Sequence, residues 1–148
     1  RGFFARRGWV GEGVAVLAIA DLLGFWVVSL ALRSLGLTTI MLPSVEDVDD
    51  LRLPDARCVV CMAQFVWPGL DEVCAARGLP LVAFSADGEA PLYIDAQRPP
   101  SGPGGAILRT SATTGAYKLV LIEPSLEVEF LLNWFAEGEA SNDGWRAK

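Results

Sequence analysis

The sequence contains no histidine, and this absence excludes several kinds of chemistry at once. Histidine is the usual general base at neutral pH and a common zinc ligand, so Ser-His-Asp systems, Cys-His systems and most zinc sites are excluded. The length of 148 residues suffices for one domain with a real core, and it excludes a large multidomain enzyme within this chain. Chemistry that relies on hydroxyls, backbone N–H groups or lysine stays open.

Positive charge is also scarce, with 12 Lys and Arg against 18 Asp and Glu, a net charge of −6. A duplex-binding surface normally carries a basic stripe, whereas here the basic residues are scattered apart from Arg1, Arg6 and Arg7. We therefore expect no nucleic-acid partner. The acidic run at 46–50 is predicted to be a solvated loop, because too few ligands flank it for a calcium loop.

Cysteine is limited to Cys58, Cys61 and Cys74. The first two form a C-x2-C motif, which is half of a zinc site or a redox pair. They lie in an apolar segment that is typical of a strand, where positions three apart point to opposite faces. No second such motif is present to complete a metal site. The sequence therefore predicts buried, reduced thiols, which suits a cytoplasmic protein.

One long hydrophobic run covers 14–32 and is interrupted only by Asp21 and Ser29. It is long enough to span a bilayer and it follows three arginines, so a membrane-anchored protein is one alternative. However, Asp21 would lie near the bilayer centre at a cost of about 2.5–3.5 kcal/mol. Residues 14–20 also suit a buried parallel strand, and Gly36 suits the end of a helix. We therefore expect a strand followed by a helix, and we do not expect a membrane as a partner.

Strand and helix patterns alternate along the chain. Short apolar strands are predicted at 14–20, 38–42, 58–63, 81–84, 106–110 and 119–122, and helices at 22–35, 67–77 and 126–136. This alternation indicates an α/β fold with a mostly parallel βαβ sheet and flanking helices. The first helix is apolar on all sides, so we expect another layer to cover it. Residues 85–105 are predicted to be turns and loop, and 138–148 a polar tail.

The segment from Thr110 to Lys118 is the most informative for function. It places four Ser and Thr hydroxyls, a glycine and a lysine within nine residues, between two apolar strands. Hydroxyls and free N–H groups in a tight loop bind anions, and a terminal lysine suits phosphate. The spacing does not fit a Walker A loop. The residues alone thus predict a phosphate-binding loop, with a Ser/Thr-rich hairpin turn of no function as the alternative.

This segment resembles the phosphate-binding signature of the adenylate-forming superfamily, which comprises acyl-CoA synthetases, nonribosomal-peptide adenylation domains and luciferases. That signature runs approximately T-S-G-T-T-G-x-P-K. Residues 13–43 resemble the early part of the same family, where an apolar strand, a helix ending in A-L-R-x-x-G and a strand ending in proline follow one another. The two stretches occur in the family's order and separation, and the resemblance covers about residues 10–137.

The resemblance implies the fold, the activity and the site. Residues 1–137 would be part of the AMP-binding N-terminal domain, with the phosphate loop at 110–118. With ATP and Mg²⁺ as cofactors, the parent enzyme would convert a carboxylic acid to an acyl-adenylate and pass the acyl group to a thiol, either CoA or a carrier protein. The residues implied to bind the ATP phosphates are Thr110, Ser111, Ala112, Thr113, Thr114, Gly115 and Lys118.

The sequence also departs from the family pattern. Ala112 stands where the signature has glycine, and Tyr117 stands where it has proline. The family's magnesium-binding acid, ribose-binding aspartate, hinge and catalytic lysine would lie beyond Lys148. We therefore expect an inactive fragment, and a first residue that is arginine rather than methionine agrees with this expectation. We also expect that the exposed apolar surface of such a fragment binds the missing remainder of the enzyme or a second copy of the chain. A non-catalytic adenylation-like binding module, or pseudoenzyme, is the alternative.

Overall fold

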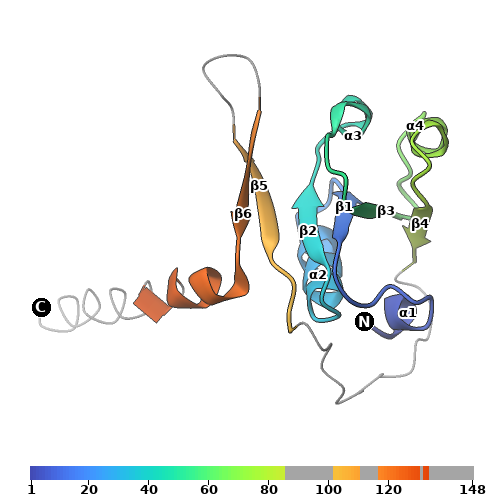
Figure 1. The fold of residues 1–148 in the computed structure, drawn as a ribbon. Coiled ribbons are helices and arrows are strands. Elements are labelled where there is room, and N and C mark those ends of the chain that lie inside the picture. Colours follow the sequence, from blue (N-terminus) through green and yellow to red (C-terminus); the bar gives the residue numbers. More distant parts are fainter. Residues whose placement is uncertain (86–101, 111–116, 131, 134–148) are drawn as a thin grey trace, which may run out of the picture.

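The fold is built on one six-stranded sheet, shown in Figure 1. The computed structural model describes residues 1–85, 102–110, 117–130, 132 and 133. The strand order is β4-β3-β1-β2-β5-β6, and all neighbouring pairs are parallel except the antiparallel β5–β6 hairpin. The bounds are β1 Val14–Ala18, β2 Thr38–Met41, β3 Ala56–Met62, β4 Leu81–Phe84, β5 Ala106–Thr110 and β6 Lys118–Ile122. The expected mostly parallel α/β sheet is confirmed.

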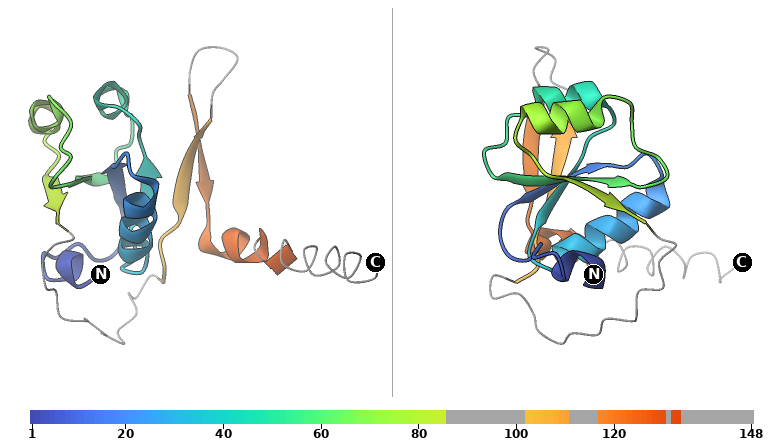
Figure 2. Two further views of the ribbon diagram at one scale, coloured as in Figure 1. Left: turned by 180° about the vertical axis from the view of Figure 1, so that it is seen from behind. Right: turned by 90° about the vertical axis from the view of Figure 1, so that its right-hand side faces the viewer.

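Helices cover both faces of the central strands. Their bounds are α1 Gly2–Ala5, α2 Leu22–Arg33, α3 Val45–Asp50 and α4 Leu70–Ala76, and residues 124–130 are also helical. One core packs α1 and α2 against β1 and β3, and a second core packs α3 and α4 against the opposite face. The right-hand view of Figure 2 shows these two helical layers on either side of the sheet.

Local sequence signals explain where helix α2 begins and where the chain turns after it. Helix α2 begins after Asp21, whose side chain accepts a hydrogen bond from the backbone N–H of Gly24. After this helix the chain turns at Gly36, which has a φ of +96°. A side chain would be strained in that conformation, so glycine suits the turn into β2.

Two helices were missed by the sequence patterns. The acidic run at 46–50 is not a loop, because it forms most of α3, and Val48 anchors that helix in the core. The hydroxyl of Ser44 accepts a hydrogen bond of 3.2 Å from the N–H of Asp47, and the pair forms half of a capping box. Helix α1 was also not predicted, although Phe4 is fully buried.

The outer face of α2 is exposed in the described structure, whereas the sequence predicted that another layer covers this helix. Leu22, Leu23, Trp26, Val27 and Leu30 are each 47–72% exposed. Val28 and Leu32, on the inner face, are buried against the sheet. Among the described residues, no helix has both the length and the apolar character needed to cross a membrane.

The cysteines confirm the strand geometry predicted for the C-x2-C motif. Cys58 belongs to the core beneath α1 and α2, whereas Cys61 belongs to the core beneath α3 and α4. Both thiols and that of Cys74 are free and buried. Burial raises the pKa of Cys58 to about 12. Such a thiol is protonated at neutral pH and therefore a poor nucleophile.

Candidate functional site

The predicted phosphate loop connects the two strands of the β5–β6 hairpin. Thr110 at the end of β5 pairs with Lys118 at the start of β6, and the Thr110 hydroxyl donates a 3.5 Å hydrogen bond to the Lys118 carbonyl. Both residues are exposed. The structure therefore brings together the first and last of the implied site residues. The others lie outside the described residues, namely Ser111, Ala112, Thr113, Thr114 and Gly115.

The loop end of the β5–β6 hairpin is anchored to α3 through Arg109. Its guanidinium forms an ion pair with Asp47, and both side chains are 17% exposed. The carbon at the centre of the guanidinium lies 3.8 Å from the centre of the Tyr117 ring, a cation–π contact. The hydrogen bond with Arg109 holds the pKa of Asp47 below its usual value, and the same bond raises the pKa of Arg109. Arg109 is therefore compensated by a carboxylate.

Two described cations remain for an anionic ligand at the loop end of the hairpin. They are Lys118 and Arg52, whose guanidinium donates to the carbonyls of Asp49 and Leu51. No ion pair involves Lys118 within the described part of the chain. The chain has one other lysine, Lys148. A small hollow of about 180 Å³ lies beside the loop end of the hairpin, and it is lined by Leu42, Asp47, Asp50, Leu51, Arg52, Arg109, Tyr117 and Leu119. The loop end of the hairpin thus presents the Lys118 ammonium and the Thr110 hydroxyl, and the ion pair of Arg109 with Asp47 holds this end against α3.

A larger apolar cleft lies on the α2 side of the hairpin. Its volume is about 1000 Å³, and α2, β2, β5, β6 and the 124–130 helix contribute to its walls. The apolar side chains that line it include Trp26, Met41, Leu108, Val120, Leu126 and Phe130. Trp26, Leu126 and Phe130 are each 47–68% exposed. The cleft can therefore take up an apolar ligand or partner.

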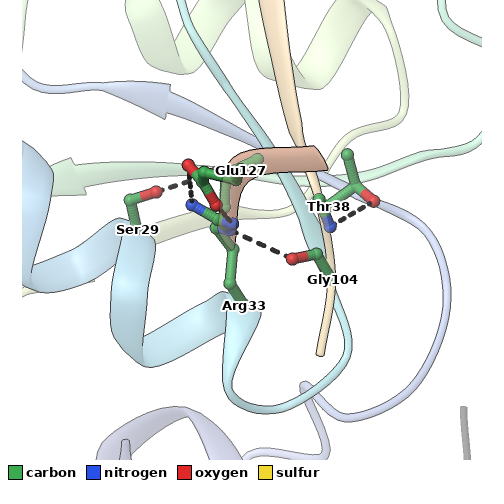
Figure 3. Close-up of polar contacts among 7 residues, drawn as sticks. Ser29, Arg33, Thr38, Gly104 and Glu127 are labelled. Carbon is green, nitrogen blue, oxygen red and sulfur yellow. Dashed lines mark hydrogen bonds and ion pairs between the residues drawn. The ribbon is translucent and has the colours of Figure 1, made fainter. Parts of the chain in front are cut away.

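Arg33, one of the residues that line this cleft, joins α2 to Glu127 and Gly104 through the polar contacts drawn in Figure 3. Its side chain is 9% exposed and forms a two-bond ion pair with Glu127, in which Nη1 and Oε1 are 3.0 Å apart. Its Nε donates a 3.0 Å hydrogen bond to the carbonyl of Gly104. Nearby, the hydroxyls of Ser29 and Thr39 share a buried hydrogen bond of 2.8 Å. The ion pair of Arg33 with Glu127 fixes the 124–130 helix against the end of α2.

The sequence patterns did not predict the ion pairs of Arg33 with Glu127 and of Asp47 with Arg109. Arg33 and Glu127 are 94 positions apart, and Asp47 and Arg109 are 62 apart, so no local spacing indicates either pair. The Ser44–Asp47 capping spacing was a usable signal for α3 but not for the ion pair. Among the described residues, no group of three or more His, Cys, Asp or Glu side chains is arranged to hold a metal ion.

Comparison of the chain with protein-family models, with curated proteins and with solved structures gives no match. The functional assignment therefore depends on the chemistry of the hairpin and on the resemblance of its sequence.

Proposed function

We propose that the β5–β6 hairpin provides the phosphate-binding loop for the ATP-dependent activation of a carboxylic acid. The observation that carries this proposal is the pairing of Thr110 with the uncompensated Lys118 at the carboxyl end of β5. Ligands of open α/β sheets bind at the carboxyl ends of the parallel strands. Hydroxyl and ammonium groups are suitable donors to phosphate oxygens.

In the proposed reaction, a carboxylate oxygen attacks the α-phosphorus of ATP, and the bond to pyrophosphate breaks. The thiol of CoA or a carrier protein then attacks the acyl carbon, and AMP leaves. In this scheme Lys118 and the loop N–H groups offset negative charge on the departing pyrophosphate. Mg²⁺ would accompany ATP, because it takes most of its ligands from phosphate oxygens and water.

Titration calorimetry with Mg·ATP and with inorganic pyrophosphate tests the proposal. Lys118→Ala should weaken binding about tenfold or more, because a charge-assisted hydrogen bond contributes about 1.5–3 kcal/mol. Lys118→Arg should retain part of the affinity, and Lys148→Ala is the matched control. Lys118 is exposed, so its substitution should leave the fold intact. Equal affinities for Lys118→Ala and Lys148→Ala would show that the assignment is wrong.

The alternative of a non-catalytic binding module is favoured by one specific observation, the open apolar cleft beside the hairpin. A pseudoenzyme of this kind would keep the fold and bind a partner through the cleft. It would bind neither ATP nor pyrophosphate in the titration above. The same measurement therefore separates the two functions.

A further inference from the structure

A second site is indicated by the topology of the sheet, away from the hairpin. From β1 the chain crosses through α2 to β2, whereas from β3 it crosses through α4 to β4 on the other side. Strands β1 and β3 are hydrogen-bonded neighbours, and α2 and α4 pack on opposite faces of the sheet. The two connections therefore diverge at the carboxyl ends of β1 and β3. Such divergence leaves a crevice, where open α/β sheets generally bind their ligands.

The structure contains a pocket at this place. Its volume is about 420 Å³, and it is lined by Ile19, Ala20, Asp21, Met62, Phe65, Val66 and Trp67. The first three follow β1 and the others end or follow β3. Phe65 and Val66 are 67% and 44% exposed, so apolar side chains lie uncovered at its rim. A pocket of this size accommodates a small organic molecule.

The loop after β3 is held in shape by backbone hydrogen bonds. The N–H of Phe65 donates to the carbonyl of Met62 at 2.9 Å, and the N–H of Leu70 donates to the carbonyl of Trp67 at 3.2 Å. These turns place two aromatic side chains beside the pocket. Aromatic walls of this kind bind apolar groups and attract organic cations through their ring faces.

Asp21 determines the sign of charge that the pocket accepts. Its carboxylate takes the N–H of Gly24 at the start of α2, so it occupies the helix end that would otherwise attract an anion. The lining contains no Lys or Arg. No ion pair involves Asp21 within the described ranges. Since the described residues supply it with no cationic partner, the carboxylate can bind a cation and repels anions.

Gly24 keeps space available next to this carboxylate. Glycine inside a helix costs about 1 kcal/mol relative to alanine. A Cβ atom at this position would lie 2.8 Å from Asp21 Oδ2 and 3.6 Å from both Ile19 Cγ2 and Met62 Sδ, all atoms of the pocket lining. A side chain here would thus crowd the carboxylate, whereas its contacts with Ile19 and Met62 would be ordinary van der Waals contacts.

From this arrangement we infer that the pocket between the ends of β1 and β3 binds a small organic ammonium ion with an apolar or aromatic body. The ammonium pairs with Asp21, and the body lies against Phe65, Val66 and Trp67. This site is distinct from the hairpin, because β2 lies between β1 and β5 in the sheet. It does not depend on nucleotide binding.

The test is a calorimetric titration of the whole chain with 2-phenylethylammonium, the neutral 2-phenylethanol and the anionic 3-phenylpropionate. We expect saturable binding of the ammonium, at least tenfold tighter than that of the alcohol, and no binding of the carboxylate. Asn caps helices as well as Asp does, so Asp21→Asn should keep α2 folded while removing the charge. This variant should lose the preference for the ammonium, whereas the exposed Asp71→Asn is the matched control and should retain it.

A second variant tests the aromatic wall without endangering the fold. Phe65 is mostly exposed, so Phe65→Ser should leave the melting temperature unchanged and weaken binding of both the ammonium and the alcohol. The proposal is overturned if the wild-type chain binds no ammonium, or binds the alcohol or the carboxylate equally well. It is also overturned if Asp21→Asn matches Asp71→Asn, or if Phe65→Ser binds as the wild type does.

Discussion

The ion pair between Arg33 and Glu127 should control the docking of the 124–130 helix. Glu127→Gln keeps the shape of the side chain and removes its charge. The Arg33 side chain, which is 9% exposed, then loses its carboxylate partner and keeps the Gly104 carbonyl and a neutral amide oxygen as acceptors. Breaking a fully buried pair costs about 3–5 kcal/mol. Glu127 is 32% exposed, so water compensates in part, and we expect a loss of about 1–2 kcal/mol.

This loss should be local, because Leu126 and Phe130 are largely exposed and the helix has few other anchors. Hydrogen exchange of the helix amides should therefore accelerate about tenfold, while amides of β1 and β3 keep their protection. Glu129→Gln is the matched control, since Glu129 is exposed and two positions away. Identical exchange in the two variants would refute the role that we assign to Glu127. A uniform loss of protection throughout the sheet would refute its local character.

Three further predictions concern packing, titration and association. Gly104→Ala should lower the free energy of unfolding measured in urea, and overpacking costs about 1–3 kcal/mol. We expect a loss at the upper end of this range, because the added Cβ would lie 2.0 Å from the Leu37 carbonyl oxygen. An unchanged urea midpoint would contradict this packing. Cys58 has its pKa raised from 9.0 to about 12, so the folded state retains a proton that the unfolded state loses. Stability should be unaffected below pH 9 and fall between pH 9 and 12, and Cys58→Ala should flatten that fall in unfolding measured against pH. The uncovered face of α2 should cause self-association in sedimentation velocity, and Leu23→Glu, at a 72% exposed position, should reduce it; a monodisperse wild-type monomer would contradict this prediction.

Much of the fold could be predicted from the sequence because its signals are local. The apolar runs gave the strands, and the alternation with helical stretches gave a mostly parallel sheet. The opposite orientation of Cys58 and Cys61 followed from the two-residue period of a strand. Helix α3 was missed because its acidic surface conceals one buried anchor, Val48, in six residues.

Long-range features could not be predicted in the same way. The position of β5 beside β2 depends on contacts such as Thr39 with Ala106, which no short pattern encodes. The same holds for the pairing of Arg33 with Glu127. Likewise, the apolar composition of α2 predicted a covering layer, but the described residues leave its outer face exposed. Composition indicates that a surface needs a partner, whereas only the assembled structure shows whether the partner is present.

The central claim is that Lys118 binds the phosphates of ATP, and the two lysines of the chain allow a direct test. Acetylation of the intact chain with an N-hydroxysuccinimide ester, followed by mass spectrometry, gives the reaction rates of Lys118 and Lys148 in one sample. We predict that saturating Mg·ATP slows acetylation of Lys118 in proportion to occupancy and leaves Lys148 unchanged. Equal rates for Lys118 with and without Mg·ATP would contradict the account.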